Sequence, residues 1–299
     1  MGDRNRGFAN GRVSLSARGW SAFIVTLPCI NTIRRERRSG RCVPLAMIKP
    51  TAPLFPWRHP AQEELERLIE AHVADPEFPC VGAKAALAHG TLQVLACDKI
   101  DSAWDDLRIH DGLLNWARVY REAPGLFRSY AAIFDGPDDL DEPSFEQAMW
   151  DRLQSLSDKD VWRGQEYDGR ASADPEDRHF SLSFGGEAFF VVGLHPRASR
   201  PARTFAKPTL VFNLHDQFEE LRRAGKYEGM REKIMVRDEA LAGSRNPMLA
   251  RHGESSEARQ YSGRIVDAGL IGSSSIDFFQ EKGSFTLAGR NGRTPVSIS

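Results

Sequence analysis

The sequence predicts an α+β fold, a single mixed-sheet domain flanked by helices, and three observations support this. Strand-like apolar runs alternate along the chain with segments whose apolar residues recur at helical spacing. One run, AFFVVGL at 188–194, lacks polar alternation, which is typical of a strand covered on both faces. The 299 residues, 41% of them hydrophobic, suffice for a buried core. We place the domain at residues 47–268.

Both ends of the chain differ from its middle. The first 46 residues hold nine arginines against Asp3 and Glu36, a net charge of +7, whereas the whole chain carries −1 and the remainder therefore −8. Arginine-rich, acid-poor composition is typical of a transit peptide, and an extension upstream of a true start at Met47 has the same appearance. We favour a basic extension and expect it to be disordered. The Gly- and Ser-rich stretch 269–299 is expected to form an irregular C-terminal tail.

Composition narrows the classes of function. A net charge of −1 gives no bulk electrostatic case for a nucleic-acid partner. The longest apolar stretch of the extension, AFIVTLPCI, is shorter than the ~20 residues that a membrane-spanning helix needs, so no membrane partner is predicted. The four cysteines, Cys29, Cys42, Cys80 and Cys97, show neither CxxC pairing nor zinc-ligand spacing. This pattern favours a reducing, cytoplasmic location.

Helices are predicted where apolar residues recur at intervals of three and four. The clearest is 143–160, in which Ser144 and Gln147 have the spacing of a capping box ahead of an apolar face. A second long helix is predicted over 100–123. Shorter helices are predicted at 59–74, 216–227 and 229–243.

Strands are predicted from short apolar runs bounded by turn residues. The pair Gly185-Gly186 predicts a hairpin within 179–196. The small residues of 81–90 are interpreted as a lead into the first strand. The other predicted strands are 91–97, 127–136 and 208–215.

The junction after the apolar run at 188–194 is the most informative place for chemistry. There the strand ends in His195-Pro196, and Arg197, Arg200 and Arg203 follow with no acidic residue among them. Arginine binds carboxylates and phosphates bidentately. An imidazole beside carboxylate-binding arginines is what a haem pocket requires, because iron takes a neutral nitrogen and the propionates take cations.

Other interpretations fit the same residues. The cluster would serve equally for a phosphate or an acidic substrate in an enzyme without iron, and a lone histidine often simply hydrogen-bonds at a strand end. The sequence contains no P-loop, GxSxG, HExxH or GxGxxG pattern, so these common catalytic motifs give no guidance.

Five ordered motifs lie within about residues 50–266: FPC at 78–80, GGEAFFVVGLHPRASRPARTF at 185–205, LVFNLHDQFEELR at 210–222, GSRNPML at 243–249 and SEARQYSGR at 256–264. Together they resemble the YqcI/YcgG family. That family includes haem-dependent N-hydroxylases of the guanidino group. The resemblance therefore implies haem b and a monooxygenase that hydroxylates a guanidino nitrogen of an arginine-like amino acid, using O₂ and a separate electron donor. The alternative is a non-catalytic haem carrier or sensor.

Carried onto this chain, the resemblance makes His195 the preferred proximal ligand of the iron. Arg200 and Arg203 are the candidates for contact with the propionates. His215 and then Cys80 are the rival ligands. A thiolate would suit an oxygenase because it favours O–O cleavage, but Pro79, the residue before Cys80, supplies no N–H to hold it. A free cysteine is also commonly just a small buried residue.

Two later residues are candidates for binding the substrate. Glu257 could pair bidentately with a substrate guanidinium, and Asn246 could reach a substrate carboxylate. The alternatives are a solvated helix face around Glu257 and a plain turn at Asn246-Pro247. The chain also lacks the Trp- and Cys-containing closing stretch that is frequent in the family.

Overall fold

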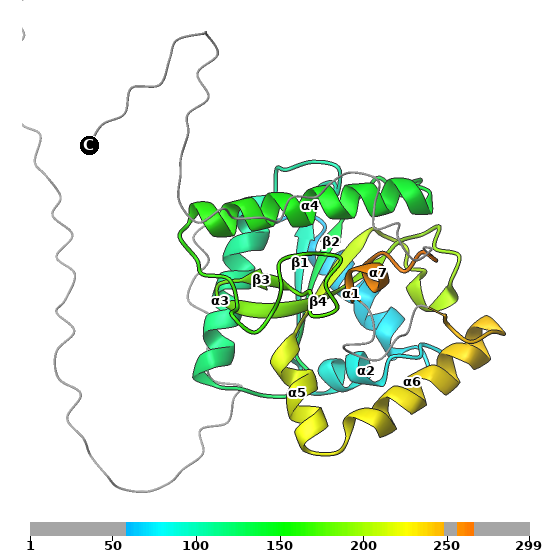
Figure 1. Cartoon of the computed structure of the whole chain (residues 1–299). Coiled ribbons are helices and arrows are strands. Elements are labelled where there is room, and N and C mark those ends of the chain that lie inside the picture. The colour runs from blue at the N-terminus through cyan, green and yellow to red at the C-terminus, as the bar shows by residue number, and fades with distance from the viewer. Residues whose placement is uncertain (1–57, 248–255, 266–299) are drawn as a thin grey trace, which may run out of the picture. The chain divides into compact units, whose positions relative to one another are not determined.

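A five-stranded mixed sheet runs through the computed structural model, which describes residues 58–247 and 256–265 (Figure 1). The strand order is β1-β2-β5-β4-β3, with β1 and β2 parallel and every other pair antiparallel. The predicted α+β class is confirmed. The extension at 1–46 and the tail at 269–299 lie outside the described residues. The strands are β1 Leu92–Cys97, β2 Ser129–Phe134, β3 Leu182–Phe184, β4 Glu187–Leu194 and β5 Thr209–Leu214.

Helices cover both faces of the sheet (Figure 1). On one face lie α3 and α4; on the other lie α1 and α2, and α5 and α6 continue this second layer. Within the described part of the chain, no helix is long and apolar enough to cross a membrane. The helices are α1 Gln62–Ala74, α2 Val81–Ala88, α3 Asp106–Glu122, α4 Glu142–Trp162, α5 His215–Arg223, α6 Tyr227–Ala242 and α7 Ala258–Tyr261, with a 3₁₀ turn, η2, at Pro201–Arg203.

The face beneath α3 and α4, which we call the packed face, carries the main core. Alternate strand residues point to each side of a sheet, and on this side Phe189, Val191 and Phe212 are fully buried. Phe189 stacks on Trp116 of α3 with ring centroids 5.9 Å apart, and Phe212 meets Phe189 edge-on at 6.4 Å. Large aromatic side chains in such geometry supply much of the stabilisation of a core.

The face beneath α1, α2, α5 and α6, which we call the open face, is less completely filled. Near α1 it has a small apolar cluster that includes Ile69 and Ala131. Farther along the strands, Phe190, Val192 and Val211 remain partly exposed although they lie within the sheet. The predicted covering of β4 on both faces is confirmed, but the second face encloses a space.

Two elements differ from the sequence prediction in their local chemistry. The small residues after the FPC motif form α2 instead of a lead into a strand, and the Sγ of Cys80 caps this helix by accepting the N–H of Ala83 at 3.4 Å. Helix α4 is capped by Asp141, which accepts the N–H of Ser144 at 2.9 Å. The predicted capping box is therefore wrong: Gln147 instead donates to Asp151.

The remaining predicted elements are confirmed with small shifts at their ends. Gly185 and Gly186 form the hairpin turn, with φ of 60° and 79°, a left-handed pair that favours glycine. The helix predicted over 100–123 begins later, at Asp106, because the segment before it forms a short turn.

Candidate functional site

A cavity of about 320 Å³ lies between the open face and helices α2, α5 and α6. This volume is within the range of small-molecule sites, ~300–1,000 Å³. Its walls are mainly apolar, as expected for a site that binds a largely apolar group. The apolar lining includes Ile69, Phe78, Phe190, Val192, Val211 and Met235.

Polar groups from five separate segments line this cavity. Cys80 comes from the start of α2, Arg203 from η2, His215 from the start of α5, and Glu257 from the turn before α7. Asn246, which follows α6, also lines it. The structure therefore brings five of the predicted site residues to one space.

Arg203 is fixed in the wall by backbone carbonyls. Its Nη1 donates to the oxygens of Gly193 at 3.1 Å and Tyr261 at 3.2 Å, and its Nη2 donates to Gln260 at 2.8 Å. Among the described residues no carboxylate forms an ion pair with it. Burial lowers the pKa of Arg203 to about 10. Asp238 is the acidic group whose charge acts on it, and because only carbonyl oxygens accept its hydrogen bonds, an anionic ligand in the cavity would stabilise this guanidinium.

Gly263 explains how α7 approaches Arg203 so closely. Its φ is +83°, and a Cβ at this position would lie 2.8 Å from the Cγ of Arg203. Glycine is therefore required for both reasons. Gly263, in the last of the five motifs, thus lets the chain pack directly against the side chain of Arg203.

His215 and Glu257 form a buried pair in the same wall. His215 Nε2 lies 2.8 Å from Glu257 Oε2, while Glu257 Oε1 accepts the hydroxyls of Ser181 and Tyr261, each at 2.8 Å. Burial, and then the charge of Glu257, raises the pKa of Tyr261 well above its ordinary value, so its hydroxyl keeps the proton that it donates. Both oxygens of Glu257 thus have partners inside the protein.

Cys80 lies at the N-terminus of α2, on the cavity wall. Burial raises the pKa of its thiol, while the N–H groups of Ala83 and Gly82 and the charge of Arg203 act in the opposite direction. The sequence argument against this sulfur was the missing N–H of Pro79. In the structure a donor comes instead from within α2, the N–H of Ala83.

His195 does not line the cavity. It follows Leu194, which faces the open side, and its ring stacks on Phe145 of α4 with centroids 4.3 Å apart and planes 16° apart. The residue is 1% exposed. Burial lowers its pKa, and Glu142 and Asp141 oppose this in part. The structure thus separates the preferred ligand of the sequence analysis from Cys80, His215 and the cavity.

Arg200 is also directed elsewhere. Its Nε lies 3.1 Å and 3.0 Å from the two carboxylate oxygens of Asp238 on α6, and its Nη2 donates to the backbone oxygen of Ser244 at 2.9 Å. This pair ties the loop after β4 to the helix that forms one wall of the cavity. Arg200 is therefore committed to the wall and is not a cation facing a ligand.

Sequence reasoning missed Arg128, which lines the cavity at the entry to β2. It is 6% exposed, burial lowers its pKa, and no carboxylate among the described residues pairs with it. Gln217 holds its backbone through both the N–H, at 2.6 Å, and the oxygen, at 2.9 Å. Phe127 before it has a φ of 57°, an uncommon strain for a non-glycine residue. The one signal in the sequence was a cationic residue immediately before a strand that is mostly apolar.

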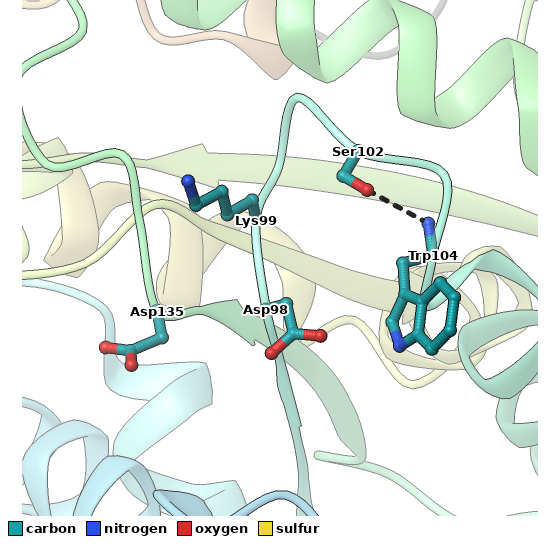
Figure 2. A pocket seen from close by; sticks show the side chains of 5 residues that line it. All are labelled: Asp98, Lys99, Ser102, Trp104 and Asp135. Atoms are coloured by element: carbon teal, nitrogen blue, oxygen red, sulfur yellow. Dashed lines mark hydrogen bonds between the residues drawn. The ribbon is translucent and has the colours of Figure 1, made fainter.

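A second, shallower hollow of about 380 Å³ lies where the parallel strands β1 and β2 end (Figure 2). Asp98 and Asp135 are its acidic groups, but Asp98 is bonded to His59 at 3.0 Å and Asp135 to Lys207 at 2.9 Å. Trp104, beside them, is 77% exposed. Because both acids already have partners, the cavity on the open face is the stronger candidate.

Comparison with known proteins agrees with the motifs. Residues 69–272 match the model of the YqcI/YcgG family, and this span is more than half of the chain. The chain belongs to the YqcI/YcgG family. No curated protein and no solved structure matches it. In this YqcI/YcgG protein the matched span contains every described side chain on the polar part of the cavity wall, from Cys80 to Glu257.

Proposed function

We propose that this YqcI/YcgG protein is a haem-dependent monooxygenase that hydroxylates a guanidino nitrogen of an arginine-like amino acid. The supporting observation is an apolar cavity whose wall carries a thiol, an imidazole and a guanidinium that no described carboxylate neutralises. Haem b requires this combination: an apolar slot, one axial nitrogen or sulfur donor, and cations for its propionates.

The residues present fit such a group in their chemistry. Cys80 or His215 would supply the axial donor, and Arg203 and Arg128 would supply positive charge near the propionates. In the described ranges, no set of three or more His, Cys, Asp or Glu side chains is arranged to hold a metal ion. Haem binding does not require such a set, because the porphyrin supplies four nitrogen ligands and the protein supplies only an axial ligand.

Haem supplies the activation of O₂ when it is bound, with electrons from a separate donor. The chain contributes the surroundings. The apolar walls of β4 and β5 exclude water from the reacting centre. Glu257 fixes the His215 ring, so that a proton can be held between Nε2 and Oε2 at the edge of the cavity.

The carboxylates of the cavity suggest where a guanidinium would bind. Asp238 and Glu257 are the acidic residues of the lining. Asp238 is ion-paired with Arg200, whereas no guanidinium or ammonium among the described residues forms an ion pair with Glu257. Glu257 would thus attract the substrate guanidinium by charge, and the Asn246 amide, which also lines the cavity, could donate to the substrate carboxylate.

The test is to express the full chain with added iron and aminolaevulinate and to quantify haem by its absorption spectrum and pyridine haemochrome. We expect stoichiometric haem, and O₂- and electron-donor-dependent formation of hydroxyarginine from arginine. Colourless protein would reject haem binding. Haem binding without turnover of any guanidino amino acid would reject the hydroxylase and support the carrier or sensor.

A further inference from the structure

Three side chains of the described domain were candidates for the iron, and their surroundings separate them. His195 is on the packed face, stacked on Phe145, and does not line the cavity. His215 lines the cavity, but its Nε2 is held by Glu257. Coordination through Nδ1 would be crowded. Nδ1 is bonded to the ring carbon that carries Cβ, so a flat macrocycle bound there would lie against the main chain of His215.

Separating His215 from Glu257 would also disturb a larger network. Glu257 is 6% exposed, and its other oxygen is held by Ser181 and Tyr261. A buried carboxylate that loses a partner keeps its desolvation cost without the compensating bond. The structure therefore favours His215 as a fixed polar group of the wall over an iron ligand.

We propose that the thiolate of Cys80 is the axial ligand of the haem iron. This inference rests on the proposed haem function and assigns its ligand. The sulfur sits at the N-cap of α2, where the Ala83 N–H points to it and the helix dipole favours negative charge. Arg203 is near enough for its charge to stabilise the thiolate.

The space beside the sulfur is open. A Cβ added at Gly82 would meet no neighbour within 4 Å except the Cys80 sulfur, at 3.9 Å. Gly82 and Ala83 both line the cavity, so the sulfur is flanked by two of the smallest side chains. This absence of bulk leaves room for a flat group to approach the sulfur.

Ligation of the iron by Cys80 would need no oxidant or reductant. On ligation the thiol would give its proton to solvent, and no electron would be transferred. A thiolate ligand favours O–O cleavage, which suits an oxygenase better than a carrier.

The chain offers a matched control. Cys97, at the end of β1, is fully buried in the core cluster of the packed face and does not line the cavity. Its Sγ donates to Leu95 at 3.8 Å. Cys97→Ser thus removes a buried thiol of the same domain without touching the proposed ligand.

The experiment compares the haem-loaded full chain with Cys80→Ser, Cys97→Ser and His215→Gln. The readouts are haem content, the electron paramagnetic resonance spectrum of the ferric form, and the Soret position of the ferrous carbonyl form. We expect a thiolate signature, including a red-shifted carbonyl Soret band, in the parent, in Cys97→Ser and in His215→Gln, and its loss in Cys80→Ser.

The outcomes separate the ligand from the function. An imidazole-type signature in the parent would overturn Cys80 as the ligand while leaving haem binding intact, and this result needs no variant to fold. Retention of the parent spectrum by Cys80→Ser would overturn it as well. A colourless parent would remove the proposed function itself, and the ligand assignment with it.

Discussion

The two faces of the central sheet are made by the same strands but are filled in opposite ways. On the packed face, Phe189 and Phe212 are fully buried against α3 and α4. On the open face, their neighbours Phe190 and Val211 stay partly exposed and line a cavity. The difference indicates that the packed face supplies most of the stability of the domain, whereas the open face leaves space for a ligand.

The largest expected effect comes from truncating the packed face. Phe189→Ala removes a ring that stacks on Trp116 and leaves a cavity, at a cost of about 3–5 kcal/mol in the free energy of unfolding. Phe190→Ala, one residue along, removes a partly exposed ring and should cost on the order of 1 kcal/mol. Chemical denaturation measures both. Equal costs would refute the division between the faces.

The second prediction concerns the wall of the open face. Arg200→Ala leaves Asp238, which is 3% exposed, without its guanidinium, and should lower the free energy of unfolding by about 3 kcal/mol. Arg223→Ala breaks the exposed pair with Glu220 and should cost less than about 1 kcal/mol. Similar thermal shifts for the two variants would mean that the Asp238 pair does not anchor α6.

The smallest effect is a pH dependence from the packed face. Burial lowers the pKa of His195 below its ordinary value of about 6.5. The unfolded chain therefore binds more protons between these two values, so stability is complete above about pH 6.5 and falls as the pH is lowered through that window. His195→Gln should reduce this slope by up to about 1.4 kcal/mol per pH unit.

Denaturation curves at a series of pH values test that slope. The pKa of His72 is also lowered by burial, so a shallower dependence of the same sign should remain in the variant. An unchanged slope in His195→Gln would show that this imidazole is as easily protonated in the folded state as in the unfolded chain.

Much of the fold was predictable because its elements have clear periods. The apolar spacing of α1 and α4 and the glycine pair of the hairpin indicated these elements directly. Helix α2 was not predicted because VGAKAALA consists of small and apolar residues apart from Lys84, and one polar residue does not reveal a helical period. The start of α3 was misplaced because the residues just before it form a turn that the sequence pattern did not separate from the helix.

The candidate site was predictable in its residue types but not in its geometry. Cys80, Arg203 and His215 do share one cavity. His195 does not, because both faces of β4 are apolar and the sequence could not tell which face had room for a ligand. Side chains of a strand alternate, so a shift of one residue moves a group to the opposite side of the sheet. The position of the Arg200 side chain could not be predicted for another reason: its partner Asp238 is distant in sequence.

Helix α6 has a consequence for how the protein would respond to its ligand. Of its sixteen residues only Met235 and Asp238 are buried, so the helix owes little of its order to its own packing. A molecule that fills the cavity would add the missing contact with Met235. Ligand binding would then be coupled to the ordering of α6, so part of the binding free energy would stabilise this helix. Protection of α6 amides from hydrogen exchange would therefore report occupancy of the site, even for a ligand with no colour of its own.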